Sequence, residues 1–152
     1  ENLVWNIEHC ETTPAEDGTW EKKPLDNIVA EGYLWGADPA PLLAHLPEGE
    51  VGKKFDVLIL ADLLFNHSEH AKLLSSIQQT LSLDGVALVF FTPYRPWLYE
   101  KDLDFLRLAD EGGFVVEKVL EEKMEKVMFE EDRGDEELRR TVFGYKLTLK
   151  KD

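Results

Sequence analysis

Two short runs of apolar residues dominate the hydrophobic pattern of the chain. Residues 57–60 read Val-Leu-Ile-Leu and residues 86–91 read Val-Ala-Leu-Val-Phe-Phe, and polar residues bound each run. Short runs that are apolar at nearly every position are typical of strands buried on both faces, as in a parallel sheet covered by helices. The pattern therefore predicts two strands buried on both faces, the first of which ends in Asp62.

Segments with helical spacing follow both runs. A helix capped by Asn66 or Ser68 is expected to run to about Leu83, where an Asp-Gly pair predicts a turn, because the apolar positions in between recur at helical spacing. A second helix is expected over residues 97–111, before a Gly-Gly pair that ends it. A short helix is also expected after Asp38, whose side chain can cap it.

The remaining segments predict further strands and a long connection. Residues 28–36 and 114–120 are expected to be strands, and the alternating residues 141–149 a last one. Residues 121–137 carry nine carboxylates against three basic side chains, which predicts a mostly exposed connection with a helical turn at residues 135–139. Since no crossover helix separates the last two strands, they are expected to form an antiparallel hairpin on an otherwise parallel α/β sheet.

Length and charge narrow the class of protein. A chain of 152 residues is long enough for one domain with a core, and it contains no run of about 18 apolar residues that would predict a membrane-spanning helix. The net charge of −14 argues against nucleic acid as a partner, because nucleic-acid binders need clustered Lys and Arg. It allows attraction to a basic protein segment, and it equally fits a solvated acidic surface.

The chain has one cysteine, Cys10. A single cysteine excludes an internal disulfide and fits a reducing compartment such as the cytoplasm. We expect Cys10 to be a small packed hydrophobe rather than a nucleophile.

The candidate site lies at the ends of the two apolar runs. In α/β sheets, ligands bind beyond the carboxyl ends of the strands, and Asp62 stands at one such end within the segment 61–66. Tyr94 and Arg95 follow the other run and are expected on the same rim. They are expected to bind substrate, although Arg95 fits an ion pair with a surface acid equally well.

Two histidines, His67 and His70, stand three positions apart close to Asp62, a spacing at which a metal could be held. No third strong ligand accompanies them. We therefore expect no metal site, and we expect both histidines to face solvent on the helix.

Three segments in combination resemble the seven-strand S-adenosylmethionine-dependent methyltransferases. They are FDVLILADLLFNHSEH at residues 55–70, VALVFFTPYRPWLYEKDLDF at 86–105 and MFEEDRGDEELRRTVFGY at 128–145. The likeness extends from about Glu1 to Leu149 and is to the nicotinamide-N-methyltransferase-like group, within it to fungal enzymes that methylate translation elongation factor 1-alpha. It implies a Rossmann-like, mostly parallel sheet that closes with an antiparallel hairpin.

The resemblance also implies roles for individual residues. Trp35 takes the position of a family Trp that flanks the adenine of S-adenosylmethionine, and Ala61 that of a residue touching this cofactor. Asp62 and Phe65 match an acid and an aromatic residue that lie beside the target amine. The resemblance also implies that Asn66, which follows Phe65, borders the substrate.

Amine methylation explains why an acid and an aromatic ring are found together. A carboxylate can orient the incoming ammonium and help relay its proton, which makes Asp62 the candidate base. The ring face of Phe65 can contact the cationic group. Both residues also have a purely structural interpretation, Asp62 as a cap of the next turn and Phe65 as part of the core.

The chain departs from the family in one large respect. It has no Gly-x-Gly cluster, whereas the glycine-rich cofactor loop of the family follows the first strand. Residues 1–152 therefore resemble the C-terminal part of a single methyltransferase domain that lacks its first strands. The strand at residues 28–36 would have no neighbour, and one side of the strand at 57–60 would be unpaired. We expect the N-terminal half to be present as another chain, or the parent protein to have been cleaved, and the chain on its own to be inactive.

Three functions remain compatible with the sequence. The first is methylation of a protein N-terminal amine, an adjacent lysine, or both, with elongation factor 1-alpha as the implied partner. The second is methylation of a small amine such as nicotinamide. The third is a non-catalytic acidic α/β module that binds a basic partner. None of them involves nucleic acid or a membrane.

Overall fold

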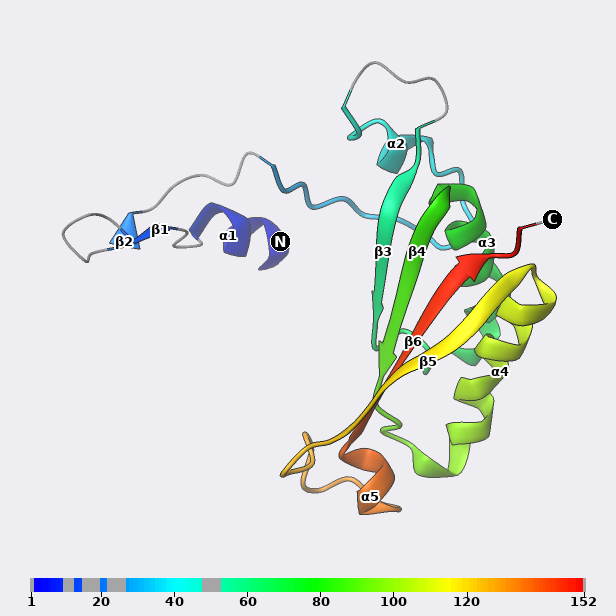
Figure 1. Ribbon diagram of the computed structural model, residues 1–152. Helices are drawn as coiled ribbons and strands as arrows, with labels where there is room; N and C mark the ends of the chain where they lie inside the picture. The colour runs from blue at the N-terminus through cyan, green and yellow to red at the C-terminus, as the bar shows by residue number, and fades with distance from the viewer. Residues whose placement is uncertain (1, 10–12, 15–19, 22–26, 48–52, 152) are drawn as a thin grey trace. The chain divides into compact units, whose positions relative to one another are not determined.

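The computed structural model describes residues 2–9, 13–14, 20–21, 27–47 and 53–151 (Figure 1). The chain divides into two compact units, Glu1–Tyr33 and Leu34–Asp152. In the first unit, helix α1 (Asn2–His9) buries none of its residues, and strands β1 (Thr13–Pro14) and β2 (Trp20–Glu21) form an antiparallel pair. Cys10 lies outside the described residues. None of the described helices is long and apolar enough to cross a membrane.

A four-stranded sheet forms the centre of the second unit. Its strands are β3 (Phe55–Ala61), β4 (Leu81–Phe91), β5 (Phe114–Lys123) and β6 (Thr141–Leu149), in the order β3-β4-β6-β5. Strands β3 and β4 run parallel, whereas β6 is antiparallel to both of its neighbours. The predicted α/β class and the C-terminal antiparallel hairpin are thus confirmed, and the parallel part of the described sheet is confined to β3 and β4.

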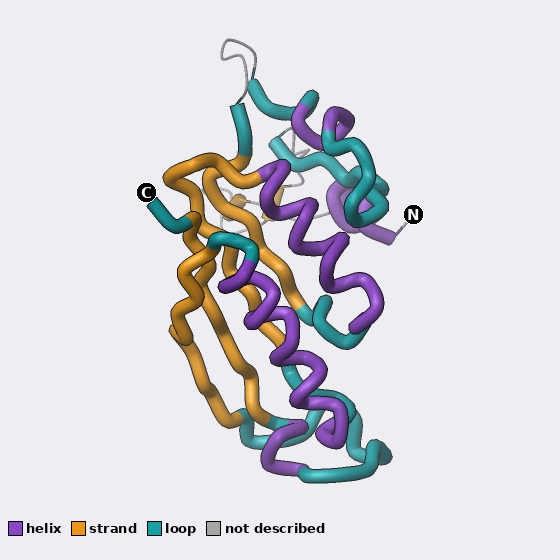
Figure 2. Tube along the Cα trace, turned by 90° about the vertical axis from the view of Figure 1, so that its right-hand side faces the viewer, coloured by secondary structure: helices purple, strands orange, loops and turns teal. Residues whose placement is uncertain are grey.

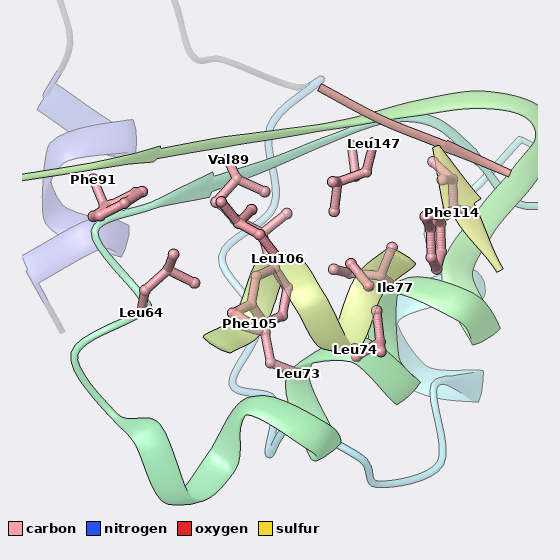
Figure 3. Packing of buried hydrophobic residues seen from close by; sticks show 14 of the residues in the cluster. Leu64, Leu73, Leu74, Ile77, Val89, Phe91, Phe105, Leu106, Phe114 and Leu147 are labelled. Atoms are coloured by element: carbon pink, nitrogen blue, oxygen red, sulfur yellow. The ribbon is translucent and has the colours of Figure 1, made fainter. Parts of the chain in front are cut away.

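Two helices cover one face of this sheet. Helices α3 (His70–Thr80) and α4 (Tyr99–Glu111) lie side by side on the same face (Figure 2). The core lies between them and the strands, where apolar side chains of α3 and α4 meet those of β4, β5 and β6 (Figure 3). Its most deeply buried members include Ile77, Val89, Phe105, Phe114 and Leu147.

The first predicted helix is shorter than the sequence suggests. A 3₁₀ turn, η1 (His67–Glu69), precedes α3, and the chain leaves the helix after Thr80. Leu81 already belongs to β4, because it pairs with Phe55 of β3 and is buried. The expected turn at Asp84-Gly85 is therefore wrong, since both residues lie inside β4.

The predicted strand at residues 28–36 is also wrong. Residues 28–34 form no strand, and within the described part of the chain no strand pairs with them. The short helix is confirmed as α2 (Ala40–Leu43), and Asp38 Oδ1 accepts a hydrogen bond from the Ala40 N–H at 3.0 Å. The predicted helical turn in the acidic connection is α5 (Glu136–Arg139), which Asp135 caps.

Strand β3 is an edge of the described sheet, as expected. Its residues Leu58 and Leu60 point to the core beneath the helices, so Val57 and Ile59 point to the opposite face. Both side chains on that face are more than half exposed, so the predicted burial of both faces is wrong for β3 in the described part of the chain. The described sheet therefore has one covered face, and its edge strand β3 exposes apolar side chains on the other face.

Candidate active site

A pocket of about 530 Å³ lies where β3 and β4 end. The segment after β3 lines it with Asp62, Leu64 and Phe65, and the segment after β4 contributes four residues, which are Thr92, Tyr94, Arg95 and Trp97. Three further regions complete the lining, namely Phe91 of β4, Asp102 of α4, and Asp132 and Arg133 of the connection between β5 and β6. The structure thus brings together four of the residues predicted from the sequence: Asp62, Phe65, Tyr94 and Arg95.

The backbone of Asp62 is left-handed, with φ 53°. A residue with a side chain pays roughly 1–2 kcal/mol for this conformation, and Asp and Asn tolerate it better than most. Two hydrogen bonds to the end of β4 hold it: the Asp62 N–H donates to the Phe90 carbonyl at 2.8 Å, and Asp62 Oδ1 accepts from the Thr92 N–H at 3.1 Å. The carboxylate therefore caps the loop after β4 rather than the turn that follows it in sequence.

Tyr94 stands next to this carboxylate. Burial, the negative charge of Asp62 and a hydrogen bond to its carboxylate raise the pKa of Tyr94 to about 12. The phenol consequently stays protonated at physiological pH, and its hydroxyl can donate to Asp62. Asp62 thus accepts from a backbone N–H, and the single hydroxyl proton of Tyr94 can go to this carboxylate or to Met128 Sδ, which lies 4.0 Å away.

The neighbouring residues Leu64 and Phe65 differ in burial. Leu64 is 1% exposed and belongs to the core, whereas Phe65 is 53% exposed and borders the pocket. The purely structural interpretation of Phe65 as a core residue is therefore wrong. Its carbonyl accepts a hydrogen bond from Arg95 Nη2 at 3.0 Å, so the guanidinium of Arg95 ties the two loops together.

The expectation that both histidines face solvent is wrong. His70 is 2% exposed and its Nε2 lies 2.7 Å from the Leu64 carbonyl, so this nitrogen carries the proton and donates. His67 Nε2 lies 2.7 Å from Oδ1 of the buried Asp102. Burial lowers the pKa of His70 and raises the pKa of Asp102. Helix α4 causes this burial, because Phe105 packs edge-on against the His70 ring.

Sequence analysis missed Asp102, although a signal was present. Asp102 stands at helical spacing with Phe105, Leu106 and Ala109, so the period of α4 places it on the buried face. A carboxylate on an apolar stripe requires a partner, and His67 supplies it. Asp132 and Arg133 were missed as individuals because their segment shows no periodic pattern.

Three predicted site residues do not line the pocket. Asn66 is exposed, and its Oδ1 accepts from the Ser68 hydroxyl at 3.3 Å. Ala61 is exposed at the end of β3. Trp35 is half-buried against the core, and the next residue, Gly36, donates its N–H to the Ser76 hydroxyl at 2.8 Å. Their roles toward cofactor and substrate remain predictions.

Among the described residues, no group of three or more His, Cys, Asp or Glu side chains is arranged to hold a metal ion.

The chain is similar in sequence to several proteins with named functions. No family model matches the chain. It is 61% identical over 124 residues to the "Protein N-terminal and lysine N-methyltransferase efm7" of Neurospora crassa, a match that covers 78% of this chain and 43% of that protein. The protein of the same name from Emericella nidulans is 51% identical over 129 residues, which are 84% of this chain and 50% of that protein. The protein of the same name from Eremothecium gossypii is 47% identical over 150 residues, which are 97% of this chain and 52% of that protein.

The chain thus spans about half the length of the curated relatives it matches. Solved structures offer weaker likenesses. M1.HpyAVI is 21% identical with a TM-score of 0.42, over 64% of this chain and 46% of that one. Precorrin-6y C5,15-methyltransferase from Geobacter metallireducens is 14% identical with a TM-score of 0.39, and the match covers 72% of this chain and 48% of that one. Neither is similar enough in shape or sequence to support a conclusion about this chain.

Proposed function

Because the chain is homologous to about half of the fungal protein N-terminal and lysine N-methyltransferases, we propose that it forms the acceptor side of such an enzyme. The reaction is transfer of a methyl group to the N-terminal amine of a protein, to an adjacent lysine, or to both. One observation carries the proposal: a fixed carboxylate, Asp62, and an exposed ring, Phe65, border the same pocket at the end of the parallel strands.

The chain's own residues would prepare the amine for attack. An α-amine has a pKa of roughly 8 and a lysine one of about 10.4, so the acceptor must lose a proton before it can attack. Asp62 would orient the ammonium and help relay that proton away from it. Phe65 would contact the cationic group with its ring face. Positioning of this kind can supply a large part of a rate acceleration.

The methyl donor proposed is S-adenosylmethionine, which supplies a methyl group on a sulfonium. Two of the described residues are proposed to contact it, following the resemblance. Ala61 is exposed next to Asp62, and Trp35 is half-buried. The sequence has no glycine-rich loop that could hold the remainder.

We propose that the N-terminal half of the domain supplies this remainder and packs along β3. The bare side of β3 supports this, because unpaired strand edges and exposed apolar side chains are costly in water. The test is the intact mass of the native protein together with the identity of any companion polypeptide. A well-folded 152-residue monomer that binds the donor by itself would disprove the idea.

Elongation factor 1-alpha is the proposed acceptor and the cytoplasm the proposed compartment, following the resemblance and the single cysteine. A methylation assay with the completed domain should compare the amino-terminal peptide of this factor with nicotinamide. Transfer to the peptide is expected. Transfer to nicotinamide alone would favour the small-amine alternative.

Calorimetry with S-adenosylhomocysteine separates an enzyme from a binding module. Binding is expected once the N-terminal half is supplied. If the completed domain bound neither this ligand nor the methyl donor, the catalytic proposal would be lost and the acidic binding module would remain.

A further inference from the structure

Exposed apolar side chains border the pocket. They are Phe65, Trp97, Met128 and Phe129, each more than half exposed, and we refer to them as the apolar rim. They come from three separate segments, the loops after β3 and β4 and the connection between β5 and β6. Single exposed apolar residues are ordinary, whereas a gathering of them beside a pocket marks an interaction surface.

Tyr94 links the members of the rim. Its ring packs edge-on against Phe129 with the centroids 5.7 Å apart, and its hydroxyl lies 4.0 Å from Met128 Sδ. Tyr94 shares the pocket lining with Phe65 and Trp97. The connection also lies close to Trp97, because a Cβ on Gly134 would stand 3.4 Å from its ring.

The backbone beneath the rim is anchored. The buried Arg139 of α5 donates from Nη1 to the Phe129 carbonyl at 2.9 Å. Asp135 caps α5 by accepting from the N–H groups of Glu137 and Leu138. Phe129 is therefore held at its backbone, and its ring rests against Tyr94 while about half of the side chain stays exposed. A partner would meet a preformed surface and would lose little affinity to ordering it.

Carboxylates follow the rim along the chain. Within residues 121–137, Glu121 and Glu137 are engaged in ion pairs with lysine and arginine side chains. Glu130 and Glu131, next to Phe129, have no ion pair among the residues that the structure describes. The acidic charge beside the pocket thus remains available to a positively charged partner.

Building on the proposed function, we propose that the apolar rim and Glu130 and Glu131 bind the segment that follows the target amine in the acceptor, as an extended peptide with aliphatic side chains and lysines. The target amine would enter the pocket toward Asp62. The rim would receive the aliphatic side chains, and the two glutamates would attract the lysines. A small amine such as nicotinamide would leave the rim uncovered.

The described rim and pocket are lined by residues of this chain, so binding can be measured without the donor. The probe is a short fluorescein-labelled peptide of alternating lysine and valine, titrated with the completed domain and with the 152-residue chain and followed by anisotropy. Phe129→Ala is expected to weaken binding about tenfold, and Glu130→Lys by a similar factor that shrinks at high salt. Thermal unfolding of each variant checks that the fold is retained.

Two matched substitutions serve as controls. Leu83→Ala removes an apolar side chain that is 81% exposed in the N-terminal part of β4, and Glu111→Lys reverses an exposed carboxylate at the end of α4. Both are expected to leave the affinity unchanged. A second probe, in which serine replaces valine and glutamate replaces lysine, is expected not to bind.

Several results would overturn the docking proposal: no binding of the basic peptide, equal binding of the second probe, or unchanged affinity of the Phe129→Ala variant. So would light scattering that showed a dimer of the chain which Phe129→Ala dissociates, because the rim would then join two copies. So would loss of peptide binding when the N-terminal half is added. The proposed enzyme fails separately, if the completed domain binds the peptide but transfers no methyl group to it.

Discussion

The pocket has two sides that are built differently. On the strand side, Asp62 and Leu64 follow β3 and are held by backbone hydrogen bonds, by burial and by His70. On the connection side, residues 128–133 keep their backbone near α5 but expose large apolar and charged side chains. The first construction suits chemistry, which needs atoms at fixed positions, and the second suits recognition. Substitutions on the strand side should therefore change turnover or stability, and those on the connection side should change affinity.

The strongest test of this division is Asp62→Asn. Asparagine tolerates the left-handed backbone and can still accept from the Thr92 N–H, so the fold should persist. Loss of the base is expected to lower kcat of the completed domain by about 100-fold or more. Asp132→Asn is the control on the connection side and should affect kcat little. Near-normal turnover of Asp62→Asn would remove this residue from the mechanism.

Stability should also differ between the two neighbours at the pocket. Leu64→Ala is expected to lower the free energy of unfolding by about 2–5 kcal/mol, because its side chain is almost fully buried. Phe65→Ala should cost less than about 1 kcal/mol, since more than half of its side chain is exposed. Urea unfolding measures both. Equal losses would show that Phe65 is packed as tightly as Leu64.

Tyr94 lies between the two sides and should combine their effects. Tyr94→Phe removes the hydroxyl that donates to Asp62 but keeps the ring against Phe129. The lost hydroxyl leaves the Asp62 carboxylate less firmly positioned, so kcat is expected to fall about tenfold. The KM for the peptide should hold, because the ring remains. A rise in KM with unchanged kcat would place Tyr94 wholly on the recognition side.

The smallest expected effect is a pH dependence of stability from His70. Burial lowers its pKa, so the unfolded chain binds a proton more readily than the folded one. The contribution of His70 is therefore fully present above a pH of about 6.5 and is lost as the pH falls through the folded pKa. His67 and Asp102 face this ring, and the raised pKa of Asp102 acts with the opposite sign at lower pH.

Urea unfolding of the wild type and of His70→Asn at several pH values tests this sign. The stability advantage of the wild type should shrink on acidification from neutral pH. An advantage that grew on acidification would mean that the imidazole gains, rather than loses, protonation in the folded state.

Features that depend on neighbouring residues in the sequence were predicted better than features that depend on strand pairing. The runs at residues 57–60 and 86–91 became β3 and β4, and Asp38 accepts a hydrogen bond at the start of α2 as predicted, because these features depend on near neighbours in sequence. The cap expected from Asn66 or Ser68 is wrong, since neither η1 nor α3 has a side-chain cap hydrogen bond. The strand expected at residues 28–36 is absent, since a strand depends on a partner that the segment itself does not specify.

The candidate site shows the same limit. Asp62, Phe65, Tyr94 and Arg95 could be placed on one rim because two parallel strands end together. The burial of His70 could not be foreseen, because it depends on the packing of α4 against α3. Asp132 and Arg133 enter the pocket from a connection whose course follows from no periodic pattern.

The left-handed backbone of Asp62 has a consequence for laboratory selection and for the interpretation of natural variants. Asparagine there would satisfy the same backbone and the same hydrogen bond, so a screen for expression or heat resistance would pass it unnoticed. Only selection on methyl transfer itself would distinguish the two side chains. Variant scores based on folding energy would therefore rate asparagine as tolerated at this position, whereas the proposed chemistry requires aspartate.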